Sequence, residues 1–367
     1  MRILLVLLNV VFVCTLPQNS TLKLVHVFFR HGSRIPDEHE LYPNHERYES
    51  YKHIGFGQLT NAGKLRSYQL GKVLRNRYND FLGEDFESNA AFIQSTNIER
   101  TKMTAMLLLA GLFPPSKRDK WNEKLNWIPI PLSLDQGDYD LWKPIYYCPT
   151  YLREMTRVLE SQEAEELKQQ YKHVFELATH KTGKAYNTMR DIFLLHQLIH
   201  VEQTMNATLP DWAVESFSDL RHIAIMQCYF ENKNTLMKRL AGGRMLSKVM
   251  EHMKDKIQNT LNPPGRKIFL YSGHDYNIVN TLASLNLYNK LHFPNFNAAV
   301  CIELHQEPST LAYFVKVFYL KDVFDEPEAQ FIPECGYMCE FSKFQEILMP
   351  YLPINYTKEC ESVINLD

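Results

Sequence analysis

The stretch RHGSRIP, which begins at Arg30, combines residue types that could bind an anion and attack it. It follows an apolar run, so Arg30 and His31 come directly after a predicted strand, where open α/β sheets bind their ligands. Arg30 and Arg34 carry planar, permanently charged guanidinium groups that suit the oxygens of phosphate or carboxylate. Gly32 lets the backbone approach a ligand closely, and Pro36 stiffens the loop. The five fixed positions of R-H-G-x-R-x-P therefore favour an anion site over a solvated basic loop.

Two further segments place useful side chains in equivalent positions. In YSGHD, His274 and Asp275 follow the apolar strand KIFLY and supply a second histidine and a candidate proton donor. In QSTNIERTKMTAM, Arg100 falls in the first turn of a helix that follows another strand. Taken alone, the pair His274 and Asp275 would indicate a structural hydrogen bond, and Arg100 would indicate a surface arginine. Together with RHGSRIP, they predict one rim of a sheet that carries arginine, histidine and aspartate.

The elements that must position these residues are strands and helices that alternate at both ends of the chain. Apolar runs predict strands at residues 22–29, in AAFIQST and in KIFLY, and a late hairpin from AAVCIELH and LAYFVKVFYL. Helical spacing predicts helices from Thr60 onward and through TKMTAMLLLAGLF. The middle, about residues 151–253, has amphipathic segments and few strand signals. We therefore expect an α/β sheet with an inserted, mostly helical subdomain at about residues 130–245.

The N-terminal segment predicts secretion. Basic Met1-Arg2 precedes ILLVLLNVVFVCTL and then polar PQNST, a pattern typical of a signal peptide. We expect this signal at residues 1–16 and a mature domain at residues 20–367. The apolar run is shorter than the roughly 20 residues that span a bilayer, so we expect no membrane anchor. Three N-x-[ST] glycosylation sequons, at Asn19, Asn206 and Asn355, fit the same compartment.

Composition and charge argue against several classes of partner. The 367 residues are 45% hydrophobic and 22% charged, which suits a globular chain with a sizeable core. The net charge of -2, without an acidic or basic tail, implies neither nucleic acid nor an anionic membrane surface as a partner. His39 and His45 lie among carboxylates in DEHELYPNHE, but without a known ligand spacing a solvated loop is the better interpretation. We expect no metal and no cofactor.

At RHGSRIP and SGHD the sequence resembles the histidine acid phosphatases of the prostatic and lysosomal type, and it is similar to insect venom acid phosphatases. The resemblance extends through GFGQLTNAGKLRSYQLG, GLFPPSK, LPDWA and PECGYMCEF and covers essentially the whole mature chain. It implies a mixed sheet flanked by helices, as in histidine phosphatases and phosphoglycerate-mutase-like proteins. Ser33 and Gly273 stand where vertebrate relatives carry aspartate and alanine, and neither change removes a catalytic group.

The resemblance also implies a role for each residue singled out above. His31 would be the nucleophile that forms a phosphohistidine, and Asp275 would protonate the leaving oxygen. The phosphoryl oxygens would be held by Arg30, Arg34, Arg100 and His274. Phosphoryl transfer needs mainly positioning and charge neutralisation, which fixed cations supply without a metal. The arginines should lower the pKa of His31. For Asp275, neighbouring arginines oppose protonation and bound phosphate favours it, so the sequence leaves its state open.

The function we expect is a secreted acid phosphatase of broad specificity that hydrolyses small phosphomonoesters, with the lysosome as an alternative location. A phytase-like or other branch of the histidine phosphatases is the nearest alternative. A secreted, non-catalytic binding protein of the same fold is the alternative from another class.

Cysteine usage fits an oxidising compartment, because six of the seven cysteines lie outside the predicted signal and would permit three disulfides. The resemblance implies the pairs Cys148–Cys360 and Cys335–Cys339. It leaves open whether Cys228 and Cys301 form a third bond or remain two buried thiols. A homodimer is expected from the resemblance alone.

Overall fold

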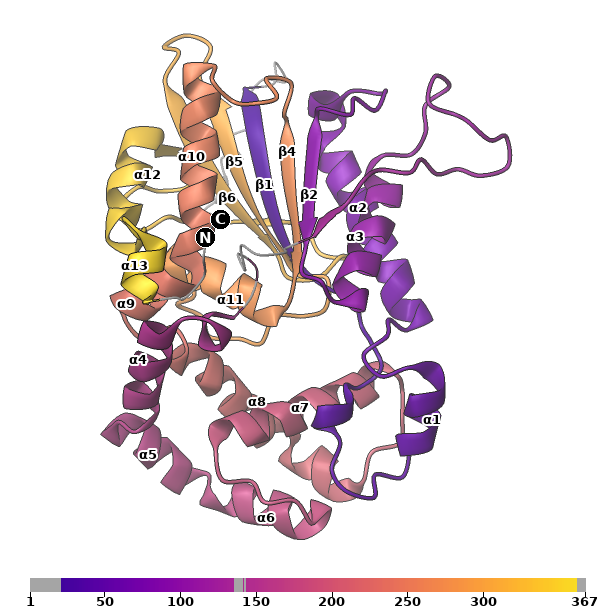
Figure 1. The fold of residues 1–367 in the computed structure, drawn as a ribbon, viewed down its shortest axis with the longest axis vertical. Coiled ribbons are helices and arrows are strands. Elements are labelled where there is room, and N and C mark those ends of the chain that lie inside the picture. Colours follow the sequence, from indigo (N-terminus) through magenta and orange to yellow (C-terminus); the bar gives the residue numbers. More distant parts are fainter. Residues whose placement is uncertain (1–20, 135–140, 142, 362–367) are drawn as a thin grey trace, which may run out of the picture.

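The computed structural model describes residues 21–361 except 135–140 and 142, and a mixed sheet lies at its centre (Figure 1). The strand order is β3-β2-β4-β1-β5-β6-β7, and β8 also pairs with β6. The strands are β1 (Leu22–Arg30), β2 (Ala91–Ser95), β3 (Ser133–Leu134), β4 (Ile268–Gly273), β5 (Ala299–Gln306), β6 (Tyr313–Leu320), β7 (Glu328–Ala329) and β8 (Cys339–Glu340). The main helices are α1 (Tyr48–Ile54), α2 (Asn61–Leu82), α3 (Glu99–Leu112), α4 (Pro149–Leu159), α5 (Gln162–Gln170), α6 (Lys172–Thr182), α7 (Met189–Thr204), α8 (Asp211–Phe230), α9 (Thr235–Lys238), α10 (Arg244–Gln258), α11 (Asp275–Ser284), α12 (Phe341–Leu348) and α13 (Tyr356–Cys360).

Strand direction brings the predicted site segments to one edge of the sheet. β1 pairs in parallel with β4, which sets Arg30 opposite Gly273, and β4 pairs in parallel with β2, which sets Ser272 opposite Ser95. β5 and β6 form the predicted antiparallel hairpin, and β5 pairs antiparallel with β1. Because β1, β2 and β4 run in the same direction, the loops that follow them leave from the same edge.

Helices cover both faces of this sheet, as the apolar residues on both sides of β1 require. Val25, Val27 and Phe29 face a core that α2 and α3 complete. Leu24 and Phe28 face the opposite core, to which α10, α11 and α12 contribute. The expected α/β class with a mixed sheet flanked by helices is confirmed.

A helical layer covers the carboxyl edge of the sheet. Helices α4 to α8 lie between β3 and β4 in the chain and form the lower part of the molecule in Figure 1. They have their own apolar core, which includes Tyr151, Ile192, Leu195, Ile223 and Phe230. α10 is different, because its apolar residues pack against the sheet. The loops after β1, β2 and β4 therefore open toward a separately packed helical layer.

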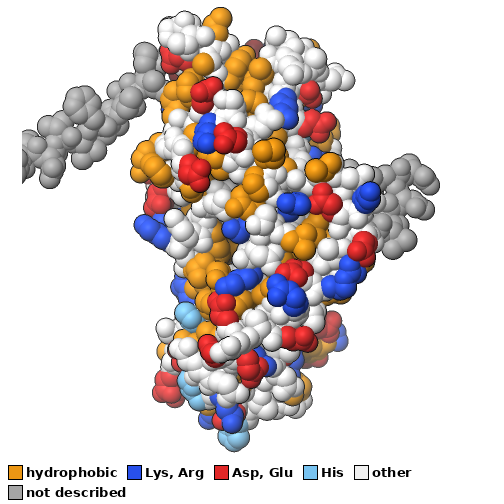
Figure 2. Space-filling view, turned by 90° about the vertical axis from the view of Figure 1, so that its left-hand side faces the viewer, with side chains coloured by type: hydrophobic (Ala, Val, Ile, Leu, Met, Phe, Trp, Pro, Cys, Tyr) orange, Lys and Arg blue, Asp and Glu red, His pale blue; other side chains and the backbone are white. Residues whose placement is uncertain are grey.

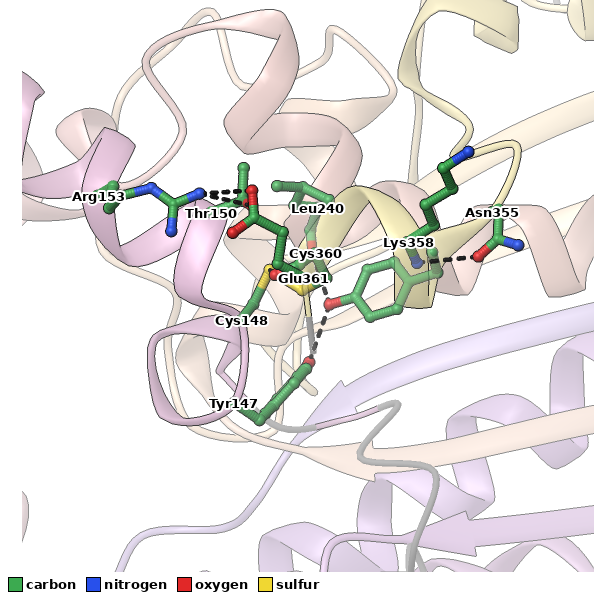
Figure 3. Close-up of a disulfide and its surroundings, with 10 residues drawn as sticks. Tyr147, Cys148, Thr150, Arg153, Leu240, Asn355, Lys358, Cys360 and Glu361 are labelled. Atoms are coloured by element: carbon green, nitrogen blue, oxygen red, sulfur yellow. Dashed lines mark hydrogen bonds and ion pairs between the residues drawn. A yellow bond between two sulfur atoms is a disulfide. The ribbon is translucent and has the colours of Figure 1, made fainter. Parts of the chain in front are cut away.

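The bond between Cys148 and Cys360 joins this helical layer to the end of the described chain (Figure 3). Cys148 precedes α4 and Cys360 ends α13. Beside the bond, Arg153 forms an ion pair of 2.7 Å with Glu361, and the Tyr356 hydroxyl donates to the Leu240 carbonyl at 3.0 Å. A link across so long a stretch of chain typically stabilises a fold by about 2–4 kcal/mol.

Cys335 and Cys339 also form a disulfide, whereas Cys228 and Cys301 are free and buried. Cys228 on α8 belongs to the core on the α10 face of the sheet, and Cys301 on β5 belongs to the core on the α2 face. Because the sheet separates the two thiols, the third pairing considered from the sequence is not formed.

The surface mixes side-chain types. On the face shown in Figure 2, hydrophobic side chains gather in small groups among acidic and basic ones. The sequon residues Asn206 and Asn355 are exposed, while the predicted signal and Asn19 lie outside the described residues. Among the residues described, no helix has the length and apolar character needed to cross a membrane.

Candidate active site

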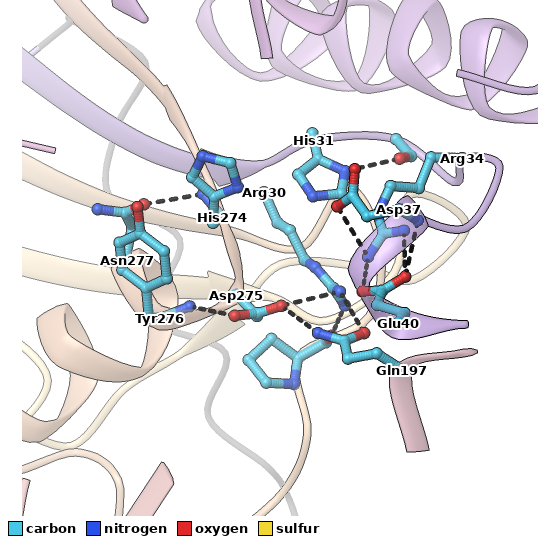
Figure 4. Close-up of polar contacts among 12 residues, drawn as sticks. Arg30, His31, Arg34, Asp37, Glu40, Gln197, His274, Asp275, Tyr276 and Asn277 are labelled. Atoms are coloured by element: carbon cyan, nitrogen blue, oxygen red, sulfur yellow. Dashed lines mark hydrogen bonds and ion pairs between the residues drawn. The ribbon is translucent and has the colours of Figure 1, made fainter. Parts of the chain in front are cut away.

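The predicted site residues lie together at the carboxyl edge of the sheet, and Figure 4 shows Arg30, His31, Arg34, His274 and Asp275 among them. One pocket of about 210 Å³ is lined by five of them, namely His31, Arg34, Arg100, His274 and Asp275. The sixth, Arg30, is fully buried and contacts Asp275. The structure thus brings together residues that are up to 245 positions apart in sequence, as the strand-end argument predicts.

Close backbone packing fixes the loop after β1. The backbone N–H of His31 donates to the carbonyl of Gly273 at 2.9 Å, which ties the end of β1 to the end of β4. A Cβ at Gly32 would lie 2.6 Å from the carbonyl oxygen of Gly63 in α2. Glycine is therefore needed at this position, because the loop lies directly against the first turn of that helix.

His31 presents an unprotonated nitrogen. Its Nδ1 lies 2.8 Å from the carbonyl oxygen of Gly32. A carbonyl oxygen can only accept, so Nδ1 carries the proton and the lone pair is on Nε2. Burial lowers the pKa of His31 well below its usual value, and the positive charges of Arg100 and Arg30 lower it further. The imidazole is therefore neutral, and Nε2 stays available for attack in mildly acidic solution.

Asp275 begins α11, and its carboxylate is fully engaged. Oδ2 lies 3.0 Å from Nη2 of Arg30 and accepts from Nε2 of Gln197 at 2.8 Å, while Oδ1 accepts from the backbone N–H of Tyr276 at 2.8 Å. Burial alone would raise the pKa of Asp275, but Arg30, Lys143 and the other donors outweigh it and hold the pKa below the usual value. In the ligand-free protein this carboxyl group is therefore ionised.

His274 caps the N-terminus of α11. Its Nε2 lies 3.1 Å from the hydroxyl of Thr96, at the end of β2, and its ring meets that of His31 edge-on at 5.4 Å. Burial and then the charge of Arg100 lower the pKa of His274 well below its usual value. The ring is therefore neutral, with one N–H to donate. The N-termini of α3 and α11 at this edge add positive potential that favours an anion.

The three arginines predicted from the sequence lie near His31, and each has a carboxylate partner. Arg30 pairs with Asp275, Arg34 with Glu40 at 2.6 Å, and Arg100 with Asp37 at 3.2 Å, so three positive and three negative charges balance. Burial lowers the pKa of Arg30 to about 10, so it stays charged in acid. The Nε atoms of all three arginines are buried without a hydrogen-bond partner among the described residues. They are therefore donors that a tetrahedral oxyanion could use.

His39 and His45, which the sequence analysis considered as possible metal ligands, lie in different surroundings. Asp37, His39 and Glu40 are close enough to hold a metal ion among the described residues, but both carboxylates already bind arginines. His45 does not line this pocket, and its Nε2 lies 3.4 Å from a carboxylate oxygen of buried Glu202.

The sequence alone did not reveal several residues of the pocket: Asp37, Glu40, Lys143, Arg190 and Gln197. Asp37 and Glu40 were visible only as part of an acidic loop. Arg190 and Gln197 lie on α7 of the helical layer, where ordinary amphipathic spacing was the only signal, and Lys143 lies in the segment before α4. Their place on the pocket wall depends on how that layer packs against the sheet.

Comparison with known proteins identifies the family. Residues 21–320 match the model of the histidine phosphatase superfamily (branch 2). The chain is 34% identical to a venom acid phosphatase of Apis mellifera over 347 residues, covering 93% of this chain and 88% of that protein. It is 33% identical to the prostatic acid phosphatase of Rattus norvegicus over 356 residues, covering 95% and 91%.

A solved structure shows the same fold. The phytase of Hafnia alvei in complex with myo-inositol hexakis sulphate aligns with a TM-score of 0.69 at 16% identity, covering 92% of this chain and 99% of that chain. At this identity the likeness concerns the fold. The family match and the two relatives carry the assignment: the chain belongs to branch 2 of the histidine phosphatase superfamily.

Proposed function

We propose that this protein is a secreted, metal-independent acid phosphatase that hydrolyses small phosphate monoesters through a phosphohistidine on His31. One observation carries the proposal. A neutral histidine with a free Nε2 lies in a pocket beside three arginines whose buried Nε–H groups lack partners. Such donors can hold the oxygens of a phosphoryl group while the nitrogen attacks phosphorus.

In the first step, Nε2 of His31 bonds to phosphorus and the bond from phosphorus to the ester oxygen breaks. Asp275 gives its proton to the departing oxygen, so an alcohol leaves and a phosphohistidine remains. Arg30, Arg34, Arg100 and His274 neutralise the phosphoryl oxygens. In the second step, water attacks phosphorus, Asp275 takes a proton from it, and the nitrogen–phosphorus bond breaks. Phosphate leaves, and neutral His31 is restored.

The proton of Asp275 has to come from the substrate or the solvent, because this carboxyl group is ionised in the free protein. The second pKa of a phosphomonoester is about 6, so below that pH the ester binds as a monoanion that carries one proton. When this proton passes to Asp275, the dianion left beside it raises the pKa of the carboxyl group. An acidic optimum follows from this transfer.

The proposal includes the compartment. A signal peptide at residues 1–16, removal of which leaves a mature domain from about residue 20, and glycans on Asn19, Asn206 and Asn355 make a secreted glycoprotein. Two bonded cysteine pairs support an oxidising compartment. The Asn355 side chain caps α13 through its Oδ1, which accepts from the backbone N–H of Lys358 at 2.9 Å. A glycan on Nδ2 leaves that cap intact. Homodimerisation rests on the family resemblance alone.

The test is hydrolysis of a panel of alkyl and aryl phosphomonoesters and inositol hexakisphosphate, from acidic to alkaline pH. His31→Ala should abolish turnover of every ester, and it should also abolish the labelled phosphoenzyme that an alkaline denaturing quench traps in the wild type. The matched control is His173→Ala, because the His173 side chain is 67% exposed and lies outside the pocket. An inactive wild type, or a His31→Ala variant that still turns over, would overturn the proposal.

A further inference from the structure

Arg190 is the one cationic side chain of the pocket wall that forms no ion pair among the described residues, although its charge, like that of Lys143, acts on Glu231. The pocket is lined by three arginines and one lysine, namely Arg34, Arg100, Arg190 and Lys143. Glu40, Asp37 and Glu231 form ion pairs with Arg34, Arg100 and Lys143. Arg190 has no such pair, and its Nη1 is buried without a hydrogen-bond partner among the described residues. Burying a guanidinium N–H without an acceptor costs free energy, and an anion that accepts from this N–H removes that cost.

The position of Arg190 relates it to the leaving group. Arg190, Phe193, Leu194 and Gln197 line the pocket from one face of α7, at the spacing of i, i+3, i+4 and i+7. Gln197 is hydrogen-bonded to Asp275, the proposed proton donor. Arg190 lies two turns away, roughly 10 Å along the helix. A sufficiently long alcohol that departs beside Asp275 can therefore reach Arg190 along this face.

The wall between these two points is apolar. Phe193 is almost fully buried, and the Arg190 guanidinium lies 4.8 Å from the centre of its ring. Lys143 lies 5.6 Å from the same ring and 5.3 Å from the ring of Tyr276, while both oxygens of Glu231 hold its Nζ at 2.8 and 2.9 Å. Glu231 thus neutralises the charge of Lys143, and the contacts of Lys143 help to position the rings of Phe193 and Tyr276.

We propose that Arg190 forms a second anion subsite, which selects phosphomonoesters whose alcohol carries a further negative group across an apolar or aromatic spacer. This inference rests on the proposed function, because it assumes that the phosphoryl group sits at His31. The reactive centre itself has balanced charges, so Arg190 supplies the excess positive charge that discriminates between leaving groups. A guanidinium can hold a carboxylate or phosphate through two hydrogen bonds.

The experiment compares two esters that differ only in charge, 4-(carboxymethyl)phenyl phosphate and 4-(carbamoylmethyl)phenyl phosphate. The methylene group insulates the phenol, so the two leaving groups have similar basicity. At about pH 6, a carboxyl group with a pKa near 4.3 is ionised. The measured quantity is the ratio of kcat/KM for the acid to kcat/KM for the amide. In the wild type this ratio should exceed one, and in Arg190→Gln it should fall by about tenfold.

Two further variants serve as references. Arg190→Lys keeps the charge and should retain more of the preference than Arg190→Gln. Arg157→Gln removes one positive charge from a side chain that is 68% exposed on α4 and should leave the ratio unchanged. If the ratio is the same in Arg190→Gln and in the wild type, the subsite proposal is overturned. In that case hydrolysis of both esters would still support the proposed phosphatase function. Failure of the wild type to hydrolyse either ester overturns the proposed function, and the subsite with it.

A binding measurement keeps the test decisive if Arg190→Gln does not fold. Inhibition of the wild type by 4-(carboxymethyl)benzylphosphonate is compared with inhibition by its amide. The subsite predicts that the acid binds several-fold more tightly. Equal inhibition constants would overturn the proposal, because the two compounds share every group except the charge.

Discussion

Both terminal nitrogens of Arg34 are held by the carboxylate of Glu40. Nη1 donates to Oε2 at 2.8 Å and Nη2 donates to Oε1 at 2.6 Å, and both side chains are 3% exposed. This two-point contact orients the guanidinium and leaves its Nε–H for another acceptor. Removing one partner of a buried pair is far more costly than removing an exposed one, because a buried charge is left uncompensated.

Glu40→Gln should therefore destabilise the free protein by about 3–5 kcal/mol, and inorganic phosphate should restore part of the loss. The measurement is the Tm with and without phosphate, in which the variant should show the larger upward shift. Glu154→Gln is the control, because its partner Arg157 is largely exposed and such pairs contribute less than about 1 kcal/mol. Equal phosphate shifts in Glu40→Gln and the wild type would mean that phosphate does not bind next to Arg34.

Asp275→Asn separates proton donation from phosphate binding. Loss of a general acid typically lowers the rate by roughly 10²–10⁴-fold, and most when the leaving oxygen is strongly basic. Alkyl phosphates should therefore be affected far more than nitrophenyl phosphate, and a labelled phosphohistidine should still form from the latter. The kcat/KM values of the two substrate classes check this. Equal losses on both would indicate that Asp275 orients the site instead of protonating the leaving group.

A chelator should leave activity intact, because Arg30, Arg34 and Arg100 supply the positive charge that phosphoryl transfer requires. The rate should decline as the pH rises above about 6, where the ester loses the proton that Asp275 needs. It should hold in mild acid, because the pKa of His31 lies well below its usual value. Rates with EDTA, and with added Zn²⁺ or Mg²⁺, test both points. An alkaline optimum or activation by metal would contradict them.

Acid should destabilise the fold through histidines that packing keeps neutral, and half-buried His200 is one whose pKa shift has a value. Its ring stacks on Phe296 at 5.5 Å, and burial, followed by the charge of Arg30, lowers its pKa to about 3. In the unfolded chain the pKa is about 6.5. Between these values the folded state binds fewer protons, so stability falls as the pH falls, by up to about 1.4 kcal/mol per pH unit.

His200→Phe should consequently lose less stability than the wild type when the pH is lowered through that window. The Tm is measured at several pH values for both proteins. A change in packing offsets the two curves of Tm against pH by a constant, so only their difference in slope reports the protonation of His200. Parallel curves would show that the folded protein does not hold His200 neutral.

The two free cysteines give a test of the fold. Cys228 and Cys301 are buried on opposite faces of the sheet, so they should resist alkylation in the native protein. After unfolding without reductant, the mature chain should take up two labels, located by mass spectrometry at these positions. Recovery of a Cys228–Cys301 crosslink would contradict the packing of α8 and β5.

The sequence alone determined which residue types the candidate site contains and at which strand ends they lie. RHGSRIP and SGHD each follow an apolar run directly in the sequence. Because each motif and its strand are neighbours in the chain, the placement of His31 and Asp275 at strand ends could be predicted without knowledge of distant contacts. Parallel strands then had to bring the two segments to one edge. The signal pattern and cysteines are equally local, and they predict a compartment without any tertiary structure.

Only the tertiary structure decided what surrounds these groups. Glu40, Gln197 and Arg190 were ordinary polar residues of a loop and a helix until packing placed them on the pocket wall. The charge state of Asp275 also depends on burial and on Arg30, which lies 245 residues earlier in the chain and 3.0 Å away in space. Electrostatic energies vary with distance and burial, and neither can be obtained from residue types in a row.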